Sequence, residues 1–239
     1  MSENPSTDAG DLGCGPLRRE AAYHGLHVLV DDDPRWGWGR DPVAQARAAC
    51  RAGVPVVQLR AKLASDHTCL AWAREIRALT RASGSRFVVN DRFDIALLAE
   101  ADAVHLGQSD LPPAALPREA RRRLAVGRST HTRAQLLASC DEEVDYVAFG
   151  PVFGTRSKSS DYSARGTAAV AEAVQIVAPR PVVVIGGIHA VHLAGLRSAG
   201  ASGFAVISAL AASPDPERSA RALMAAFDGR EAEMPGSRT

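Results

Sequence analysis

Short apolar runs rich in β-branched residues alternate along the chain with longer segments in which Ala, Leu and Arg recur at helical spacing. A short apolar run is typical of a buried strand, and a period near 3.6 is typical of an amphipathic helix. Eight strands are predicted at Leu26–Val30, Val56–Arg60, Arg86–Asn90, Ala103–Leu106, Ala125–Ser129, Tyr146–Gly150, Val182–Gly186 and Gly203–Ile207. A helix is predicted after each of them, at 42–52, 66–83, 93–99, 113–124, 132–140, 167–178, 190–199 and 216–227.

Eight such alternations predict an α/β fold made of a single (β/α)8 TIM barrel over residues 21–228. Residues 1–20 and 229–239 carry little periodic apolar pattern, and we expect them to be flexible tails. A doubly wound open sheet is the competing architecture, but its Gly-x-Gly-x-x-Gly turn is absent after the first predicted strand. The loop 31–39 stands there instead, and its tryptophans either cover a planar ligand or pack on the barrel rim.

Composition excludes several classes of protein. A net charge of +1 on 239 residues removes the bulk electrostatic argument for nucleic acid, and no apolar stretch is long enough for a membrane span. The four cysteines form no Cys-x-x-Cys pair, so we expect plain reduced thiols rather than a zinc site or a disulfide framework. The N-terminal stretch has no apolar core of a secretory signal, and we expect a cytoplasmic protein.

The pentad Gln58-Leu59-Arg60-Ala61-Lys62 ends the second predicted strand. In a strand, positions 58, 60 and 62 point to the same face. Inside a covered sheet, an amide and two cations are costly unless they are paired, so an anionic ligand is the expected partner. The alternative is that Arg60 and Lys62 leave the sheet and lie in water.

Candidate binding residues, most of them polar, also lie at the ends of the other predicted strands, where TIM barrels carry their active sites. They are Asn90 and Asp91; His105, Gln108 and Asp110; Ser129, Thr130 and His131; Thr155, Arg156, Ser157 and Lys158; Gly186 and Gly187; and Ile207 and Ser208. Gly186, Gly187 and Ser208 occupy the place where barrels commonly bind phosphate through backbone N–H groups. A Gly-Gly pair is also simply a tight turn, and that alternative stays open.

Asp91 and Asp110 offer carboxylate oxygens that suit Mg²⁺, which also takes phosphate oxygens and waters. The alternative for each aspartate is a helix cap. Arg60, Lys62 and Lys158 contribute three positive charges, Mg²⁺ adds two and the two aspartates subtract two, so the site carries about +3. A diphosphate ester carries roughly three negative charges, which matches this value.

Four histidines have weaker signals. His105 is expected to be a satisfied residue of the barrel interior, whereas His131 either transfers a proton or starts a helix. His189 and His192 have the spacing of metal ligands but no third ligand nearby in sequence, so they are expected at the surface. No nucleophile elbow, Walker loop or His-Glu-x-x-His motif is present.

Taken together, these motifs resemble the thiamine-phosphate synthases and their relatives, the thiazole tautomerases, over nearly all of residues 26–227. The resemblance is carried by the pentad 58–62 and by Val89-Asn90-Asp91-Arg92, Val104-His105-Leu106-Gly107-Gln108-Ser109-Asp110, Gly127-Arg128-Ser129-Thr130-His131, Gly150-Pro151-Val152-Phe153-Gly154-Thr155-Arg156-Ser157-Lys158 and Ile185-Gly186-Gly187-Ile188. It implies that hydroxymethylpyrimidine diphosphate and thiazole phosphate are joined to give thiamine monophosphate and diphosphate. Small-molecule substrates are therefore the expected partners, and a homo-oligomer is left open.

The resemblance also implies roles for individual residues. The pyrimidine-diphosphate contacts are Gln58, Leu59, Arg60, Ala61, Lys62, Asn90, Ser129 and Lys158. The thiazole-phosphate contacts are Thr155, Arg156, Ser157, Gly187, Ile207 and Ser208, and the ligands of a Mg²⁺ cofactor are Asp91 and Asp110. In the implied mechanism diphosphate departs first and the thiazole nitrogen captures the pyrimidine cation, with Arg60, Ser129 and Lys158 as catalytic residues.

Two features depart from the family pattern: Ala61 stands where the family often has Glu, and the 31–39 loop has no counterpart that we can match. A thiazole tautomerase is the nearest alternative function, with His131 aligned to its histidine. A non-catalytic barrel that binds a thiamine-related phosphate is the second alternative. The presence of Asn90, Asp91, Asp110 and Lys158 together favours the synthase.

Overall fold

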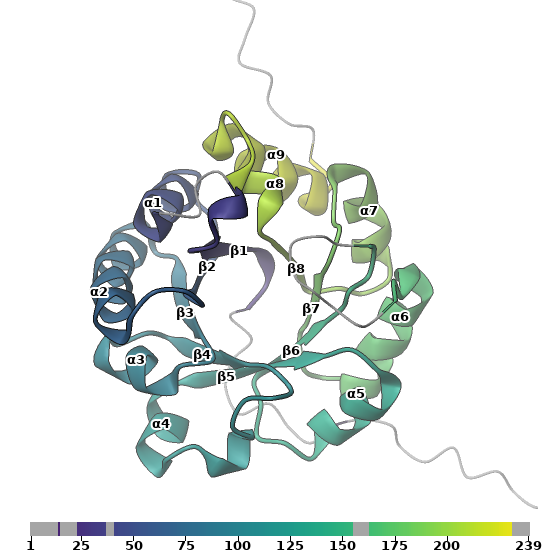
Figure 1. Ribbon diagram of the computed structural model, residues 1–239. Helices are drawn as coiled ribbons and strands as arrows, with labels where there is room; N and C mark the ends of the chain where they lie inside the picture. The colour runs from purple at the N-terminus through teal and green to yellow at the C-terminus, as the bar shows by residue number, and fades with distance from the viewer. Residues whose placement is uncertain (1–13, 15–22, 37–40, 155–162, 231–239) are drawn as a thin grey trace, which may run out of the picture.

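Eight parallel strands close into a barrel in sequence order, with β8 paired to β1 (Figure 1). The computed structural model describes residues 14, 23–36, 41–154 and 163–230. The strands are β1 Gly25–Asp31, β2 Val56–Arg60, β3 Arg86–Asn90, β4 Ala103–Leu106, β5 Ala125–Thr130, β6 Tyr146–Phe149, β7 Val182–Ile185 and β8 Gly203–Val206. The predicted (β/α)8 fold is confirmed, and each predicted strand agrees with the observed one to within one residue at either end.

The helices form a ring outside the barrel (Figure 1). They are α1 Pro42–Arg51, α2 Asp66–Ser83, α3 Phe93–Leu98, α4 Arg118–Arg123, α5 Arg133–Cys140, α6 Gly166–Val177, α7 Ala190–Ser198, the short α8 Ser208–Ala211 and α9 Pro216–Asp228, with 3₁₀ turns η1 Pro34–Trp36 and η2 Pro113–Ala115. The prediction of one helix over 113–124 is wrong. Pro117 holds the extended residue Leu116 before α4 and so separates η2 from that helix.

Alternation along each strand divides the apolar residues into two layers. Val57 and Leu59 of β2 face outward and join the large core between the sheet and the helices. Val56 faces inward and joins the small cluster inside the barrel. Gln58 and Arg60 share the inward face, so β2 delivers both polar side chains to the barrel interior.

Helix boundaries follow local capping chemistry. Asp41, Ser65, Thr132 and Asp215 each accept a backbone N–H in the first turn of α1, α2, α5 and α9. No helix in the described part of the chain is long and apolar enough to cross a membrane.

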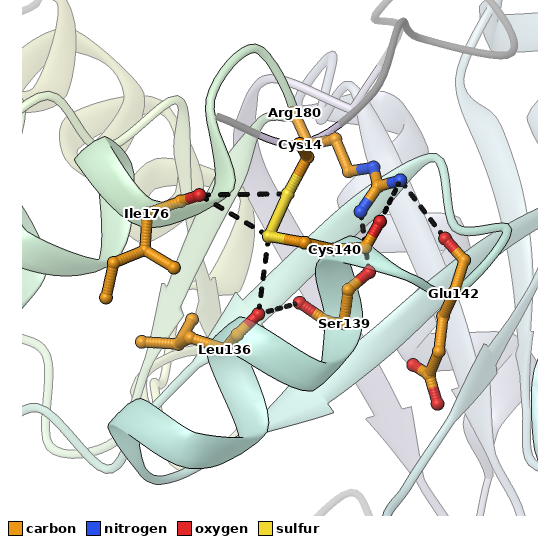
Figure 2. The surroundings of a disulfide bond; sticks show 7 residues. All are labelled: Cys14, Leu136, Ser139, Cys140, Glu142, Ile176 and Arg180. Carbon is orange, nitrogen blue, oxygen red and sulfur yellow. Dashed lines mark hydrogen bonds between the residues drawn. A yellow bond between two sulfur atoms is a disulfide. The ribbon is translucent and has the colours of Figure 1, made fainter. Parts of the chain in front are cut away.

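The prediction that all four cysteines are free thiols is wrong. Cys14 and Cys140 form a disulfide that links residues 126 positions apart (Figure 2). Cys50 and Cys69 are free. The backbone N–H of Cys14 also donates to Ala178 at 2.8 Å, so this residue is held against the barrel. Residues 1–13 and 15–22 lie outside the described residues, and the flexible tail expected there stays a prediction.

Arg180 holds the chain around this disulfide. Its guanidinium donates to the backbone oxygens of Ser139 at 2.6 Å, Glu142 at 3.1 Å and Cys140 at 3.2 Å (Figure 2). A cation at the carboxyl end of a helix satisfies carbonyls that have no partner within the helix. Arg180 therefore fixes the end of α5, where Cys140 lies, against the loop before β7.

Candidate active site

A cavity of about 520 Å³ opens at the carboxyl ends of the strands. Seven of the residues predicted to bind substrate line it: Gln58, Arg60, Asn90, Ser129, Gly187, Ile207 and Ser208. They come from β2, β3, β5, β7 and β8 or from the loops that follow, so the fold gathers side chains that are far apart in sequence.

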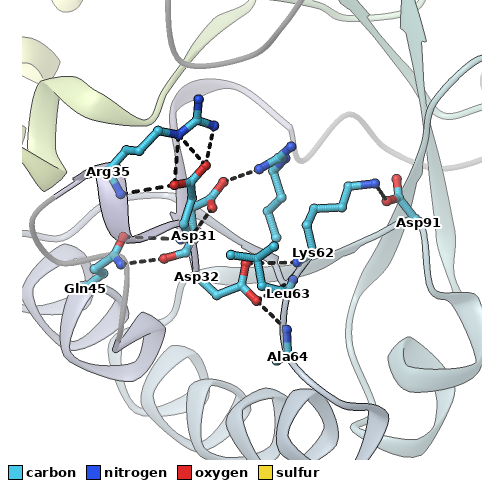
Figure 3. Close-up of polar contacts among 10 residues, drawn as sticks. Asp31, Asp32, Arg35, Gln45, Lys62, Leu63, Ala64 and Asp91 are labelled. Atoms are coloured by element: carbon cyan, nitrogen blue, oxygen red, sulfur yellow. Dashed lines mark hydrogen bonds and ion pairs between the residues drawn. The ribbon is translucent and has the colours of Figure 1, made fainter.

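Three other predicted residues, Leu59, Ala61 and Lys62, do not line this cavity. The side chain of Leu59 is buried in the core between sheet and helices, and Ala61 packs against that same core. Lys62 lies just beyond β2, with its side chain 46% exposed, and pairs with Asp91 at the mouth of the barrel (Figure 3). The predictions for Thr155, Arg156, Ser157 and Lys158 fall outside the described residues, as do those for the side chains of Trp36 and Trp38.

Asp91 and Asp110 lie side by side. Although Asp91 follows β3 and Asp110 follows β4, each carboxyl group shifts the pKa of the other. Asp91 has a φ of 64°, a left-handed conformation that is uncommon for a residue other than glycine. This backbone turn follows β3 directly, so it sets the direction in which the carboxylate leaves the strand.

The pKa values of the two carboxyl groups are shifted in opposite directions. Burial, followed by the neighbouring Asp110, raises the pKa of Asp91 above its usual value despite the ion pair with Lys62. Burial alone would raise the pKa of Asp110, but hydrogen bonds from Asp91 and from the N–H of Gly107 lower it. Two neighbouring carboxylates repel each other unless a proton or a cation lies between them. Their paired oxygens suit a divalent ion. Within the described ranges, no group of three or more His, Cys, Asp or Glu residues forms a complete metal cage.

A hydrogen-bonded chain forms the floor of the cavity. Tyr146 Oη lies 3.0 Å from Nδ1 of His105, and Nε2 of His105 lies 2.8 Å from Oγ of Ser129. Burial raises the pKa of Tyr146, which keeps the phenol neutral. The prediction that His105 is a satisfied interior residue is confirmed, and the same contacts orient the Ser129 hydroxyl.

His27 is buried beside this chain, and burial lowers its pKa from 6.5 to about 3. The imidazole is therefore neutral in the folded protein but protonates in the unfolded chain below pH 6.5. We expect stability to fall as the pH drops from 6.5 towards 3, by up to about 4 kcal/mol from this residue. Urea unfolding at a series of pH values measures this. His27→Phe should show a shallower loss over that range, and an identical pH profile would contradict the assignment.

The wall after β6 and β7 is built from backbone. Gly187 has a φ of 61°, and a Cβ placed there would lie 2.3 Å from the carbonyl oxygen of Gly154. A Cβ on Gly186 would lie 2.7 Å from both Cα and Cβ of Pro151. Both glycines are therefore required by the close approach of the loop after β6. The turn also exposes backbone to the cavity beside Ser208, where α8 begins.

Two further histidines, His131 and His189, also line the cavity. Nδ1 of His131 lies 2.6 Å from the carbonyl oxygen of Gly150, and its backbone N–H donates to Gln135 at the start of α5. His192 stacks on Phe153 with ring centroids 3.8 Å apart and accepts from the backbone N–H of His189. The surface position expected for both holds for His189, which is exposed, whereas His192 is half-buried against Phe153.

Sequence patterns missed two parts of the site. Tyr146 fits the pattern as the first apolar residue of a strand, but it faces His105 inside the barrel. Asp31 and Asp32 fit the pattern as part of a polar loop, but both are buried and contact the residues that end β2. Two adjacent acidic residues at the end of an apolar strand were the available signal for the second part.

Comparison with known proteins decides the family. A model described as thiamine monophosphate synthase matches residues 26–210. The chain belongs to this family. Thiamine-phosphate synthase of Anaeromyxobacter dehalogenans is 45% identical over 219 residues, covering 90% of this chain and 92% of the relative. The enzyme of the same name from Thermus thermophilus is 44% identical over 201 residues, covering 83% of this chain and 94% of the relative.

A solved structure agrees with this assignment to the thiamine monophosphate synthase family. Thiamine phosphate pyrophosphorylase from Pyrococcus furiosus superposes with a TM-score of 0.76 at 29% identity, covering 86% of this chain and 96% of that one. Orotidine 5′-phosphate decarboxylase from Pyrococcus horikoshii has a TM-score of 0.58 at 14% identity, which shows only that the barrel fold is shared. The resemblance seen in the sequence motifs is confirmed at the level of the family.

Proposed function

We propose that the protein is a thiamine-phosphate synthase, which joins hydroxymethylpyrimidine diphosphate to thiazole phosphate with release of diphosphate. The observation that carries the proposal is the grouping of Gln58, Arg60, Asn90, Ser129 and Ser208 around one cavity in a member of this family. A volume of about 520 Å³ falls in the range of sites for small molecules.

The chain's own residues have complementary tasks in this reaction. Arg60, inside the mouth, stabilises negative charge that grows on the departing diphosphate oxygens. Ser129, held by His105, and the amide of Gln58 orient the pyrimidine near the floor of the cavity. Gly187 and Ser208 hold the thiazole phosphate through backbone and hydroxyl donors, and Lys158, which follows β6 in the sequence, acts on the leaving group.

The paired carboxylates of Asp91 and Asp110 suit Mg²⁺, and these two residues would hold it. When bound, the ion supplies positive charge next to the diphosphate oxygens. Lys62, which pairs with Asp91, contributes a cation to the same rim. The reaction requires no covalent nucleophile, so catalysis by this chain consists mainly of positioning and charge stabilisation.

The purified protein, given both phosphorylated halves and Mg²⁺, is expected to form thiamine phosphate and release diphosphate in equal amounts. Chromatography of the products and a diphosphate assay measure the two yields. Chelation of the metal should stop the reaction, and added Mg²⁺ should restore it. Absence of product from folded, metal-supplied protein would reject the synthase.

Two further arms of this experiment cover the alternatives. A tautomerase would isomerise the unrearranged thiazole carboxylate phosphate without a pyrimidine substrate. A regulatory barrel would bind thiamine phosphate without forming it from the two halves. His131, which aligns with the tautomerase histidine, donates a hydrogen bond from its ring to the carbonyl oxygen of Gly150, and this contact supports a structural role for the residue.

A further inference from the structure

Asp31 is a buried acid at the carboxyl end of β1, directly next to Arg60 in the register of β1 and β2. Its Oδ2 accepts a hydrogen bond from Nη1 of Arg60 at 2.5 Å. Its Oδ1 accepts one from the backbone N–H of Asp33 at 2.9 Å. Both carboxylate oxygens are therefore occupied by donors, and one of the donors lines the cavity.

The backbone of Asp31 is itself held in place. Gln45, a buried residue of α1, accepts from the N–H of Asp31 at 3.2 Å and donates to its carbonyl oxygen at 2.8 Å (Figure 3). Asp32 accepts the backbone N–H groups of Lys62, Leu63 and Ala64 at 2.8 to 2.9 Å, which ties the end of β2 to the same corner. The carboxylate of Asp31 thus projects from a rigid support.

A guanidinium is a planar group with five N–H donors, so a fixed contact at one nitrogen restricts the direction of the others. The side chain of Arg60 is 15% exposed and that of Asp31 is fully buried, so water competes little for their contact. We propose that Asp31 is a positioning residue, which holds the guanidinium of Arg60 in the orientation that binds the diphosphate group. This rests on the proposed function, in which Arg60 contacts that group.

The alternative is that Asp31 only balances the charge of Arg60. The two interpretations predict effects of opposite sign for Asp31→Asn. Removing a negative charge without loss of orientation strengthens the binding of an anion. Loss of orientation weakens it, because a carboxamide offers one acceptor where the carboxylate offers two, and its NH₂ then faces either Asp33 N–H or Arg60.

Calorimetric binding of inorganic diphosphate in the presence of Mg²⁺ distinguishes these interpretations. Asp31→Asn is expected to weaken binding at least tenfold. Asp33→Asn is the matched control, because it removes the same charge two residues further along the chain. The carboxylate of Asp33 pairs with the exposed Arg35, so this substitution should change binding less than twofold. Unchanged or tighter binding by Asp31→Asn would overturn the proposal.

A double-mutant cycle tests whether Asp31 acts through Arg60. Asp31→Asn is expected to lower kcat about 30-fold in the wild-type background and less than twofold in an Arg60→Gln background. A general structural role would give the full loss in both backgrounds and would overturn the proposal. If Asp31→Asn does not fold, Gln45→Met removes the side-chain contacts to the Asp31 backbone and should weaken diphosphate binding at least threefold; unchanged binding would again be contrary.

The readouts separate this inference from the proposed function. A wild type that binds diphosphate but makes no thiamine phosphate rejects the synthase, and the binding comparison still decides the role of Asp31. A wild type that does not bind diphosphate rejects the positioning role as well.

Discussion

Gly127→Ala is expected to lower the free energy of unfolding by about 4 kcal/mol and to abolish measurable catalysis. Gly127 in β5 lies in register between His105 of β4 and Tyr146 of β6, whose side chains meet above it. A Cβ at this position would lie 2.2 Å from Cζ of Tyr146 and 2.5 Å from Nδ1 of His105. Overpacking costs about 1 to 3 kcal/mol, and a broken buried hydrogen bond adds about 1 to 3 kcal/mol.

Urea unfolding and kcat measure the two effects. Gly195→Ala is the matched control, because it makes the same substitution in α7, where the nearest atom is Cγ2 of Thr167 at 4.0 Å. Alanine in a helix is favoured over glycine, so this control should gain up to about 1 kcal/mol. A Gly127→Ala protein with wild-type stability would show that the barrel interior adapts, contrary to the packing described here.

Loss of the Cys14–Cys140 disulfide is expected to lower the free energy of unfolding by about 4 kcal/mol. The bond joins residues 126 positions apart, and a cross-link over a long loop restricts the unfolded chain most strongly. Cys140→Ser and a chemical reductant should therefore have similar effects on urea unfolding. Cys50→Ser is the control, because Cys50 is a free thiol and its substitution should leave the response to reductant unchanged.

Alkylation followed by mass spectrometry tests the pairing directly. In the non-reduced protein, Cys14 and Cys140 should resist alkylation, whereas both should react after reduction and unfolding. Four alkylated cysteines in non-reduced, unfolded protein would show that the bond does not form. An unfolding curve that is insensitive to reductant would contradict the stability effect.

The barrel was predictable from the sequence because buried parallel strands require apolar, β-branched runs, and these are bounded by turn residues. The strand Val56–Arg60 is an example in which pattern and structure coincide. The interruption at Leu116 was not predicted because the spacing of apolar residues around it remains helical. The helix is broken there by the steric effect of Pro117 on the backbone of the preceding residue. Pro117 is therefore the local signal for the break between η2 and α4.

The polar rim was predictable for a related reason: strand ends meet at one mouth in any TIM barrel, so Gln58, Arg60 and Ser129 had to converge. Contacts between side chains were not predictable. The pairing of Asp31 with Arg60 depends on the register of β1 and β2, and the contact of Tyr146 with His105 crosses from β4 to β6. The disulfide depends on how residue 14 approaches α5, which no local pattern encodes.

The contact between the glycine turn after β7 and the loop after β6 affects how this cavity can be redesigned. Gly186 and Gly187 leave no room for a side chain beside Pro151 and Gly154, so a bulkier residue there would displace both segments together. Side chains on the inner face, such as Leu29 and Ile185, line the cavity without this backbone constraint. A search for variants that accept altered heterocycles therefore has most freedom on those strands and least at the paired glycines.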